Sequence, residues 1–90
     1  MIAVTGEGAW SVTTPLLGQT FTGAGDITAA LFLAHLLTTG STADAVARTA
    51  AIVYAVLKAT IDSGEAELQL VRAQDQIADP DQVFDVVRLR

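Results

Sequence analysis

The chain has 90 residues, of which 51% are hydrophobic and 17% charged, and its formal net charge is −5 at pH 7. The five basic residues are scattered and form no patch, so we expect no nucleic-acid partner. The absence of cysteine excludes disulfide bonds and thiolate metal sites. No basic segment precedes the first apolar residues as in a secretory signal, and the apolar run 27–37 is too short for a membrane span, which needs ~20 residues. These features predict a cytoplasmic protein with no membrane partner.

Two brief extended runs at the start of the chain, residues 2–4 and 9–13, flank a turn that contains two glycines. Apolar runs separated by a glycine-containing turn are typical of a β-hairpin, and we expect this one at the edge of a sheet. Residues 14–22 contain a proline and a glycine, which predicts a loop.

A first helix is predicted over residues 26–39, which contain no proline and end before Gly40. Its apolar residues cover nearly the whole circumference, and a helix of this kind is normally buried on all sides. A chain of this length buries only about 60–65% of its unfolded surface, so it can hardly supply that much cover. The residues in question are Ile27, Leu31, Phe32, Leu33, Leu36 and Leu37.

A second helix is predicted over residues 43–62, with Ser41 or Thr42 as its N-cap and Asp44 in its first turn. Ser63 and Gly64 end it. The tail is ambiguous, because residues 68–73 alternate as in a strand while the spacing of later apolar residues suits a helix. A turn at 79–81 and a final extended segment at 83–89 complete the predicted elements.

The sequence Thr22-Gly23-Ala24-Gly25-Asp26 stands directly before the first helix. Glycines let the backbone approach a ligand closely, and the unpaired N–H groups of a helix N-terminus bind anions such as phosphate. A carboxylate there competes with phosphate unless it acts as a general base on an incoming hydroxyl group. The alternative is that Asp26 is simply an N-cap, since aspartate is favoured there. The spacing alone leaves both interpretations open.

The T-G-A-G-D run followed by an apolar helix resembles the signature of the ribokinase-like superfamily. Within it, the chain is similar to the pyridoxal kinase family over essentially all 90 residues. The segments that carry this resemblance are V-T-G-E-G-A-W-S-V at 4–12, T-P-L-L at 14–17 and E-L-Q-L-V-R-A-Q-D-Q-I-A-D-P at 67–80.

The resemblance implies an α/β fold, in which residues 1–90 form the C-terminal part of a single three-layer α/β/α kinase domain. Such a part would contain an edge hairpin, an anion-hole loop, two packed helices and a short terminal strand. The implied reaction is ATP-dependent phosphorylation of the 5′-hydroxymethyl group of pyridoxal, in vitamin B6 salvage.

In that family, the residue matching Asp26 is the catalytic base and contacts the substrate, while the backbone of Gly23, Ala24 and Gly25 holds the transferring phosphoryl group. The stretch Thr14, Pro15, Leu16 and Leu17 would bind ATP. The resemblance also implies Mg²⁺ as cofactor, pyridoxal and related B6 vitamers as substrates, and a homodimer at full length.

Family members are roughly three times longer, and the motifs that place Mg²⁺ and the pyridoxal ring are missing here. We therefore expect the 90-residue chain to be inactive alone. Another alcohol kinase of the superfamily is an alternative. However, residues 19–22 lack the acidic residue usual in sugar kinases, and hydroxymethylpyrimidine kinases carry cysteine where Asp26 stands. A non-catalytic module that docks on a partner through its helices is the alternative of a different class.

Overall fold

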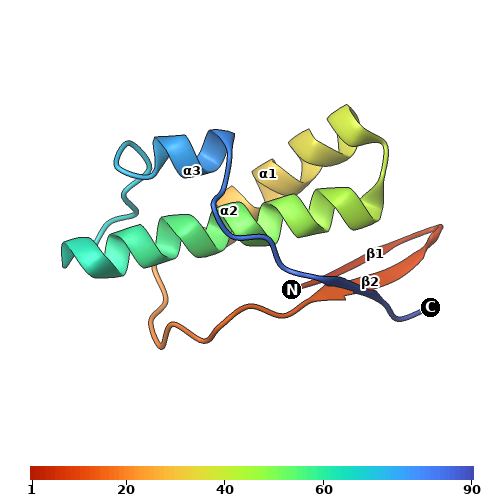
Figure 1. Cartoon of the computed structure of the whole chain (residues 1–90), viewed down its shortest axis with the longest axis horizontal. Helices are drawn as coiled ribbons and strands as arrows, with labels where there is room; N and C mark the ends of the chain where they lie inside the picture. Colours follow the sequence, from red (N-terminus) through yellow and green to blue (C-terminus); the bar gives the residue numbers. More distant parts are fainter.

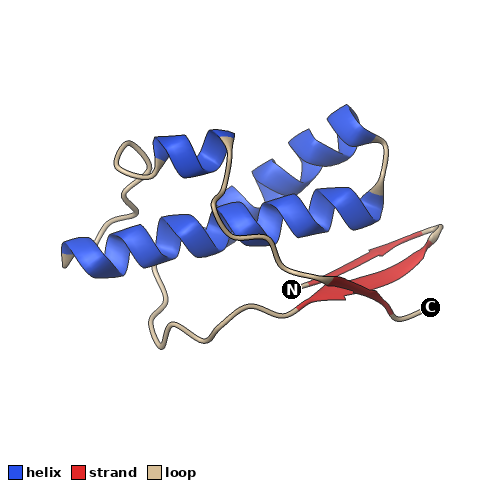
Figure 2. Ribbon diagram, in the orientation of Figure 1, coloured by secondary structure: helices blue, strands red, loops and turns tan.

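The computed structural model describes residues 1–90 and contains three strands and three helices (Figures 1 and 2). In chain order they are β1 (Ile2–Thr5), β2 (Gly8–Val12), α1 (Ala24–Thr39), α2 (Thr42–Ser63), α3 (Gln74–Ala78) and β3 (Val86–Arg88). This mixture of helices with a small antiparallel sheet agrees with the predicted α/β class. None of the helices combines the length and hydrophobicity needed to span a bilayer.

The sheet has the order β1-β2-β3, and both pairings are antiparallel. The hairpin is confirmed, with β1 at the edge. β2 lies in the centre because the end of the chain returns beside it, where Ser11 is opposite Val87. Side chains alternate between the two faces of a strand. Ala3 and Val12 therefore face α2, against Val46.

The helix α2 is the centre of the molecule and contacts all five other elements. Figure 1 shows it running between the sheet and the other two helices. Its cap confirms the prediction: the Asp44 N–H donates to the Ser41 Oγ at 3.2 Å. Gly64 ends the helix with a left-handed backbone, at φ 75°. Local signals therefore place this helix to within a residue of its predicted bounds.

The tail folds back along α2. Ala73 is buried against Ile52 and Val56 of α2, and the Gln69 N–H donates to the Oγ1 of the fully buried Thr60 at 3.0 Å. Residues 70–73 form a turn that leads into α3, and the strand alternative for residues 68–73 is wrong. Their alternating pattern has no partner strand, since the sheet consists of β1, β2 and β3 alone. The predicted extended end is confirmed for the short strand β3.

The expectation that 90 residues can hardly cover the apolar circumference of the first helix is confirmed for α1. The helix begins two residues earlier than expected, and none of its residues is buried. Leu31 and Phe32 pack against the two hydrophobic clusters around α2, whereas Leu33 and Leu37 remain 56% and 78% exposed. The reason is that α2 is the one helix or strand packed extensively against α1.

Candidate active site

The turn before α1 is built by Gly23, which is the N-cap and has a left-handed backbone with φ 89°. Residues other than glycine adopt this conformation at a cost. Ala24 and Gly25 are the first two helical residues and Asp26 is the third. No side chain caps the helix, so the interpretation of Asp26 as an N-cap is wrong. Its carboxylate lies beside the first turn instead.

The first turn of α1 has free backbone donors. The Ala24 N–H donates to the Phe21 carbonyl oxygen at 3.2 Å, and the Ile27 N–H donates to the Gly23 carbonyl oxygen at 3.0 Å. Between them, the N–H groups of Gly25 and Asp26 have no acceptor in the protein. Two adjacent donors at the positive end of a helix form a small anion site.

The carboxylate of Asp26 is exposed and takes part in no hydrogen bond or ion pair. It is therefore free to accept a proton from a bound hydroxyl group, and its own backbone N–H belongs to the pair of free donors. Within residues 1–90, an acceptor for a proton and donors for an oxyanion thus stand on the same turn. This combination is what phosphoryl transfer to an alcohol requires of a protein.

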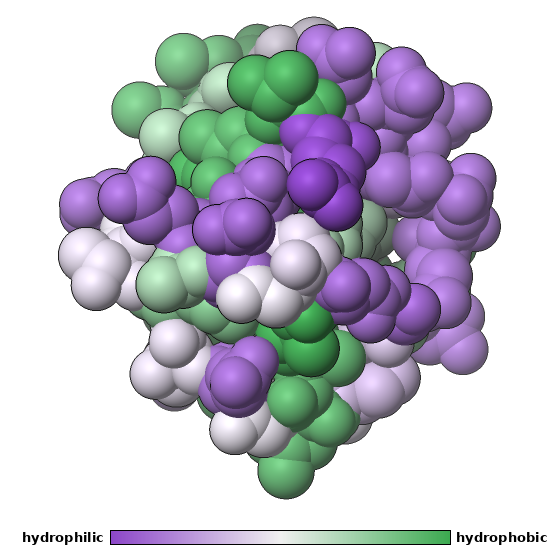
Figure 3. Space-filling view, turned by 90° about the vertical axis from the view of Figure 1, so that its left-hand side faces the viewer, coloured by the Kyte–Doolittle hydropathy of each residue, from purple (hydrophilic) through white to green (hydrophobic).

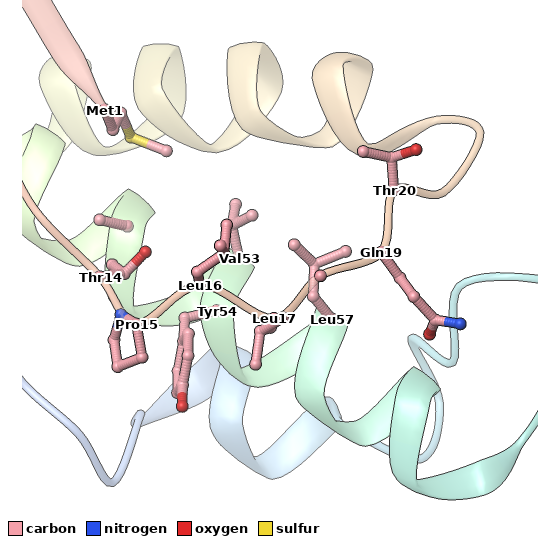
Figure 4. Close-up of a pocket in the computed structure, with 12 residues that line it drawn as sticks. Met1, Thr14, Pro15, Leu16, Leu17, Gln19, Thr20, Val53, Tyr54 and Leu57 are labelled. Atoms are coloured by element: carbon pink, nitrogen blue, oxygen red, sulfur yellow. The ribbon is translucent and has the colours of Figure 1, made fainter.

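The stretch predicted to bind ATP lies on the loop between β2 and α1. Thr14, Pro15, Leu16 and Leu17 line a cavity of about 530 Å³ between this loop and α2. Figure 4 shows the loop crossing α2 at this cavity. Leu16 is 96% exposed, so its side chain has almost no protein contact.

Several residues of this cavity were not among the predicted site residues. Among them, Val53 and Leu57 lie on α2. Neither belongs to a sequence motif, so no local signal marks them as site residues. The residues that line the cavity in addition to the loop are Met1, Ala50, Val53, Tyr54 and Leu57.

The two parts of the predicted site do not share a cavity. Asp26 lines none of the cavities, whereas Gly25 borders a separate groove of about 410 Å³ between β1 and α1. Met1 lies at the border of both openings. The 90 residues thus provide two separate surfaces that face outward. No cluster of three or more His, Asp or Glu side chains able to hold a metal ion is present.

No protein-family model matches the chain. Among curated proteins, it is 51% identical over 89 residues to the pyridoxal kinase PdxY of Rubrobacter xylanophilus. It is 46% identical over 89 residues to that of Leifsonia xyli, and 45% identical over 91 residues to that of Pseudomonas savastanoi. Each comparison covers 99% of this chain. The chain matches a C-terminal segment of the pyridoxal kinases.

The resemblance inferred from the T-G-A-G-D run and the tail is thereby confirmed. The chain spans about a third of the length of the curated pyridoxal kinases that it matches, since the shares are 31% for the Rubrobacter and Leifsonia proteins and 32% for the Pseudomonas protein.

Proposed function

We propose that the chain supplies the catalytic base and the anion-binding turn of a pyridoxal kinase, which transfers a phosphoryl group from ATP to the 5′-hydroxymethyl group of pyridoxal. The observation that carries the proposal is the first turn of α1. There, the free N–H groups of Gly25 and Asp26 accompany an unpaired carboxylate. The similarity to pyridoxal kinases over 99% of the chain supports the choice of reaction.

In the proposed mechanism, the hydroxyl oxygen of the substrate attacks the γ-phosphorus of ATP while Asp26 accepts the proton of that hydroxyl group. The bond from that phosphorus to the β,γ-bridging oxygen breaks, and ADP leaves. The free backbone N–H groups of Gly25 and Asp26, on the turn that Gly23 and Ala24 begin, stabilise the charge on the transferring group. The Ala24 N–H donates to the Phe21 carbonyl oxygen, so Ala24 shapes the turn and is not one of these donors. Since this charge is spread over the phosphoryl oxygens, fixed donors are more effective than mobile water.

ATP would lie along the loop residues Thr14, Pro15, Leu16 and Leu17, with its base toward the apolar cavity beside α2. Adenine is flat and largely apolar, and the cavity of about 530 Å³ is large enough for it. Mg²⁺ would supply further charge neutralisation when bound, through residues outside this chain. The other B6 vitamers carry the same hydroxymethyl group and are proposed as alternative substrates.

The fold proposed for the intact enzyme is the three-layer α/β/α arrangement of the ribokinase-like superfamily, with residues 1–90 as the C-terminal part of its single domain. In the structure, helices cover one face of the sheet, toward which Ala3 and Val12 point. Homodimer formation and a cytoplasmic location are further proposals, which light scattering and cell fractionation of the intact protein would test.

The test is a chimera in which this chain replaces the matching segment of the Rubrobacter xylanophilus kinase. Formation of pyridoxal 5′-phosphate from pyridoxal and Mg-ATP is measured for the chimera and for the 90-residue chain alone. We expect product from the chimera and none from the chain alone. A folded chimera without activity would contradict the proposed function. A chain that is active alone would contradict the proposal that it carries only part of the site.

A further inference from the structure

The segment that follows α2 is tied back to the end of that helix by two hydroxyl groups. Thr60 is fully buried, and its hydroxyl group accepts the Gln69 N–H at 3.0 Å and donates to the Val56 carbonyl oxygen at 2.8 Å. Ser63 donates to the Thr60 carbonyl oxygen at 2.7 Å and accepts the Glu65 N–H at 3.1 Å. Figure 3 shows this end of the molecule, where apolar patches lie among polar ones. The path of the tail is therefore fixed relative to α2.

The fixed tail places Leu68, the residue before Gln69, between α2 and the start of α1. Leu68 is half-buried and packs against a hydrophobic cluster of three residues, Ile52, Val56 and Ala73. It also lies against Gly23, because a Cβ atom built on that glycine would stand 3.7 Å from the Leu68 Cδ1. This is a van der Waals contact distance, and no other non-neighbouring atom lies within 4 Å of that point. Leu68 thus connects the core around α2 to the N-cap of α1.

The turn at the start of α1, residues 23–26, has few other supports. No side chain caps the helix. Two openings border the region. One of about 540 Å³ is lined by Phe21 of the preceding loop and by Glu65 of the tail, among others, and one of about 410 Å³ includes Gly25. Segments with few packing contacts open locally at low cost, so the contact with Leu68 matters for the order of this turn.

Gly23 closes the turn that carries the free donors. Its carbonyl oxygen accepts the Ile27 N–H at 3.0 Å, and the unpaired N–H groups of Gly25 and Asp26 lie between these two residues in the chain. A displacement of Gly23 would open this first helical bond and change the direction of both donors. Donors fixed in advance stabilise a developing charge better than donors that must reorient during the reaction. The placement of Gly23 is therefore relevant to catalysis.

We propose that Leu68 is a positioning residue, which holds Gly23 and thereby keeps the donors of residues 23–26 aligned for phosphoryl transfer. The inference rests on the proposed function, because the alignment of these donors has a catalytic use only there. Leu68 acts through Gly23 and does not touch the reacting groups. The bond between Thr60 and Gln69 sets the place of Leu68, so a buried hydroxyl group of α2 supports the start of α1.

The kinetic test uses the chimera in which this chain replaces the matching segment of the Rubrobacter xylanophilus kinase. Leu68→Ala removes the contact with Gly23. The control Ile77→Ala removes a half-buried side chain from the same hydrophobic cluster, but Ile77 is not in contact with Gly23. Leu68→Met keeps an apolar side chain of similar volume. All four proteins are assayed well below their unfolding temperatures, so that lost stability alone does not lower the rate.

We expect Leu68→Ala to lower kcat by roughly 10–100-fold, since small displacements of catalytic groups have effects of this order. The KM values for pyridoxal and ATP should change little, because the donors act mainly on the charge of the transition state. Ile77→Ala and Leu68→Met should keep kcat close to that of the unmodified chimera. A merely structural role of Leu68 would give Leu68→Ala and Ile77→Ala the same kinetics.

A second readout does not depend on activity. NMR order parameters of the Gly23 and Gly25 amides are measured in the 90-residue chain. In the unmodified chain we expect values near the rigid limit of about 0.85, and in the Leu68→Ala variant a fall toward the flexible range below about 0.6. Ile77→Ala should leave both values unchanged, because it does not alter the contact with Gly23.

A further pair of variants tests the support of Leu68 by α2. Thr60→Val keeps the shape of the side chain and removes the acceptor of the Gln69 N–H, whereas Thr60→Ser keeps the hydroxyl group. We expect Thr60→Val to lower kcat with nearly unchanged KM and Thr60→Ser to retain kcat. When Thr60→Val is combined with Leu68→Ala, the loss should be smaller than the product of the two single losses, because both act through one contact. If Leu68→Ala unfolds the chain, the Thr60 pair carries the test.

The proposal is overturned if Leu68→Ala and Ile77→Ala have equal effects on kcat, or equal effects on the order parameters of Gly23 and Gly25. It is also overturned if Leu68→Ala raises KM and leaves kcat unchanged, since this would indicate a role in substrate binding. The order parameters separate this proposal from the function. A turn that is loosened by Leu68→Ala alone, in a chain whose folded chimera makes no pyridoxal 5′-phosphate, would support the positioning contact and contradict the proposed function.

Discussion

The two long helices show how differently a local sequence and its surroundings contribute to burial. α1 is the more apolar of the two, yet none of its residues is buried, whereas eleven residues of α2 are buried. α2 concentrates its apolar residues on the sides that face the sheet, α1 and the tail. α1 has apolar residues all round and one extensive partner. A helix with apolar residues on all sides is therefore buried only when other elements pack against every side of it.

The first turns of these two helices differ in how their backbone N–H groups are satisfied. Each has aspartate as its third helical residue, Asp26 in α1 and Asp44 in α2. The N–H of Asp44 is satisfied by the Ser41 side chain at 3.2 Å. The N–H of Asp26 has no acceptor, because the N-cap is Gly23 and has no side chain. α2 begins with a side-chain cap, while α1 begins with two backbone N–H groups that have no acceptor in the protein.

The largest effect is expected from the acidic residues of these two turns. In the chimeric kinase, Asp26→Asn should lower kcat by roughly 10²–10⁴-fold, the usual contribution of a general base. The matched change Asp44→Asn should leave kcat nearly unchanged, because this carboxylate lies in the first turn of a capped structural helix. Steady-state kinetics of pyridoxal phosphorylation check both. Equal losses from the two variants would show that Asp26 has no special role.

A large effect on stability is expected in α2 and a small one in α1. Ile52 is fully buried, so Ile52→Ala should lower the free energy of unfolding of the isolated chain by about 2–5 kcal/mol. Leu37 is 78% exposed, so Leu37→Ala should change it by less than about 0.5 kcal/mol. Urea unfolding followed by circular dichroism measures both. A comparable loss at Leu37 would mean that α1 is covered in the isolated chain.

An intermediate effect is expected from the cap of α2. Ser41→Ala removes the acceptor for the Asp44 N–H and should cost about 1 kcal/mol of stability. Thermal unfolding of the isolated chain measures this change. Ser41→Asp serves as the control, since aspartate is an equally good cap and should retain the stability. If Ser41→Asp is as unstable as Ser41→Ala, the hydrogen bond of the cap is not the source of the effect.

A small effect of opposite sign is expected at Gly25. This residue is helical, does not have a positive φ, and has open space where a Cβ would stand. Gly25→Ala should stabilise the isolated chain by about 0.5–1 kcal/mol, because alanine is the better helix former. Gly23→Ala, at φ 89°, should destabilise it. Chemical denaturation of the two variants, compared side by side, would contradict this account if both changes had the same sign.

The sequence alone determined the elements whose signals are local. The cap at Ser41 and the end at Gly64 define α2, the glycine-containing turn defines the hairpin, and Gly23 to Asp26 mark the start of α1. These features depend on backbone conformations and hydrogen bonds between residues a few positions apart. The similarity to pyridoxal kinases was likewise readable from short motifs. All of them can therefore be predicted without knowledge of the distant parts of the chain.

Only the tertiary structure decided which distant segments of the chain pack or pair with one another. The tail forms turns and α3 because Ala73 and Gln69 meet α2 there, and β3 exists because the chain returns to pair with β2. The exposure of α1, the cavity between Leu17 and α2, and the separation of that cavity from Asp26 also depend on contacts between distant segments. Burial and pairing are properties of a surface and its neighbour together, so no local pattern contains them.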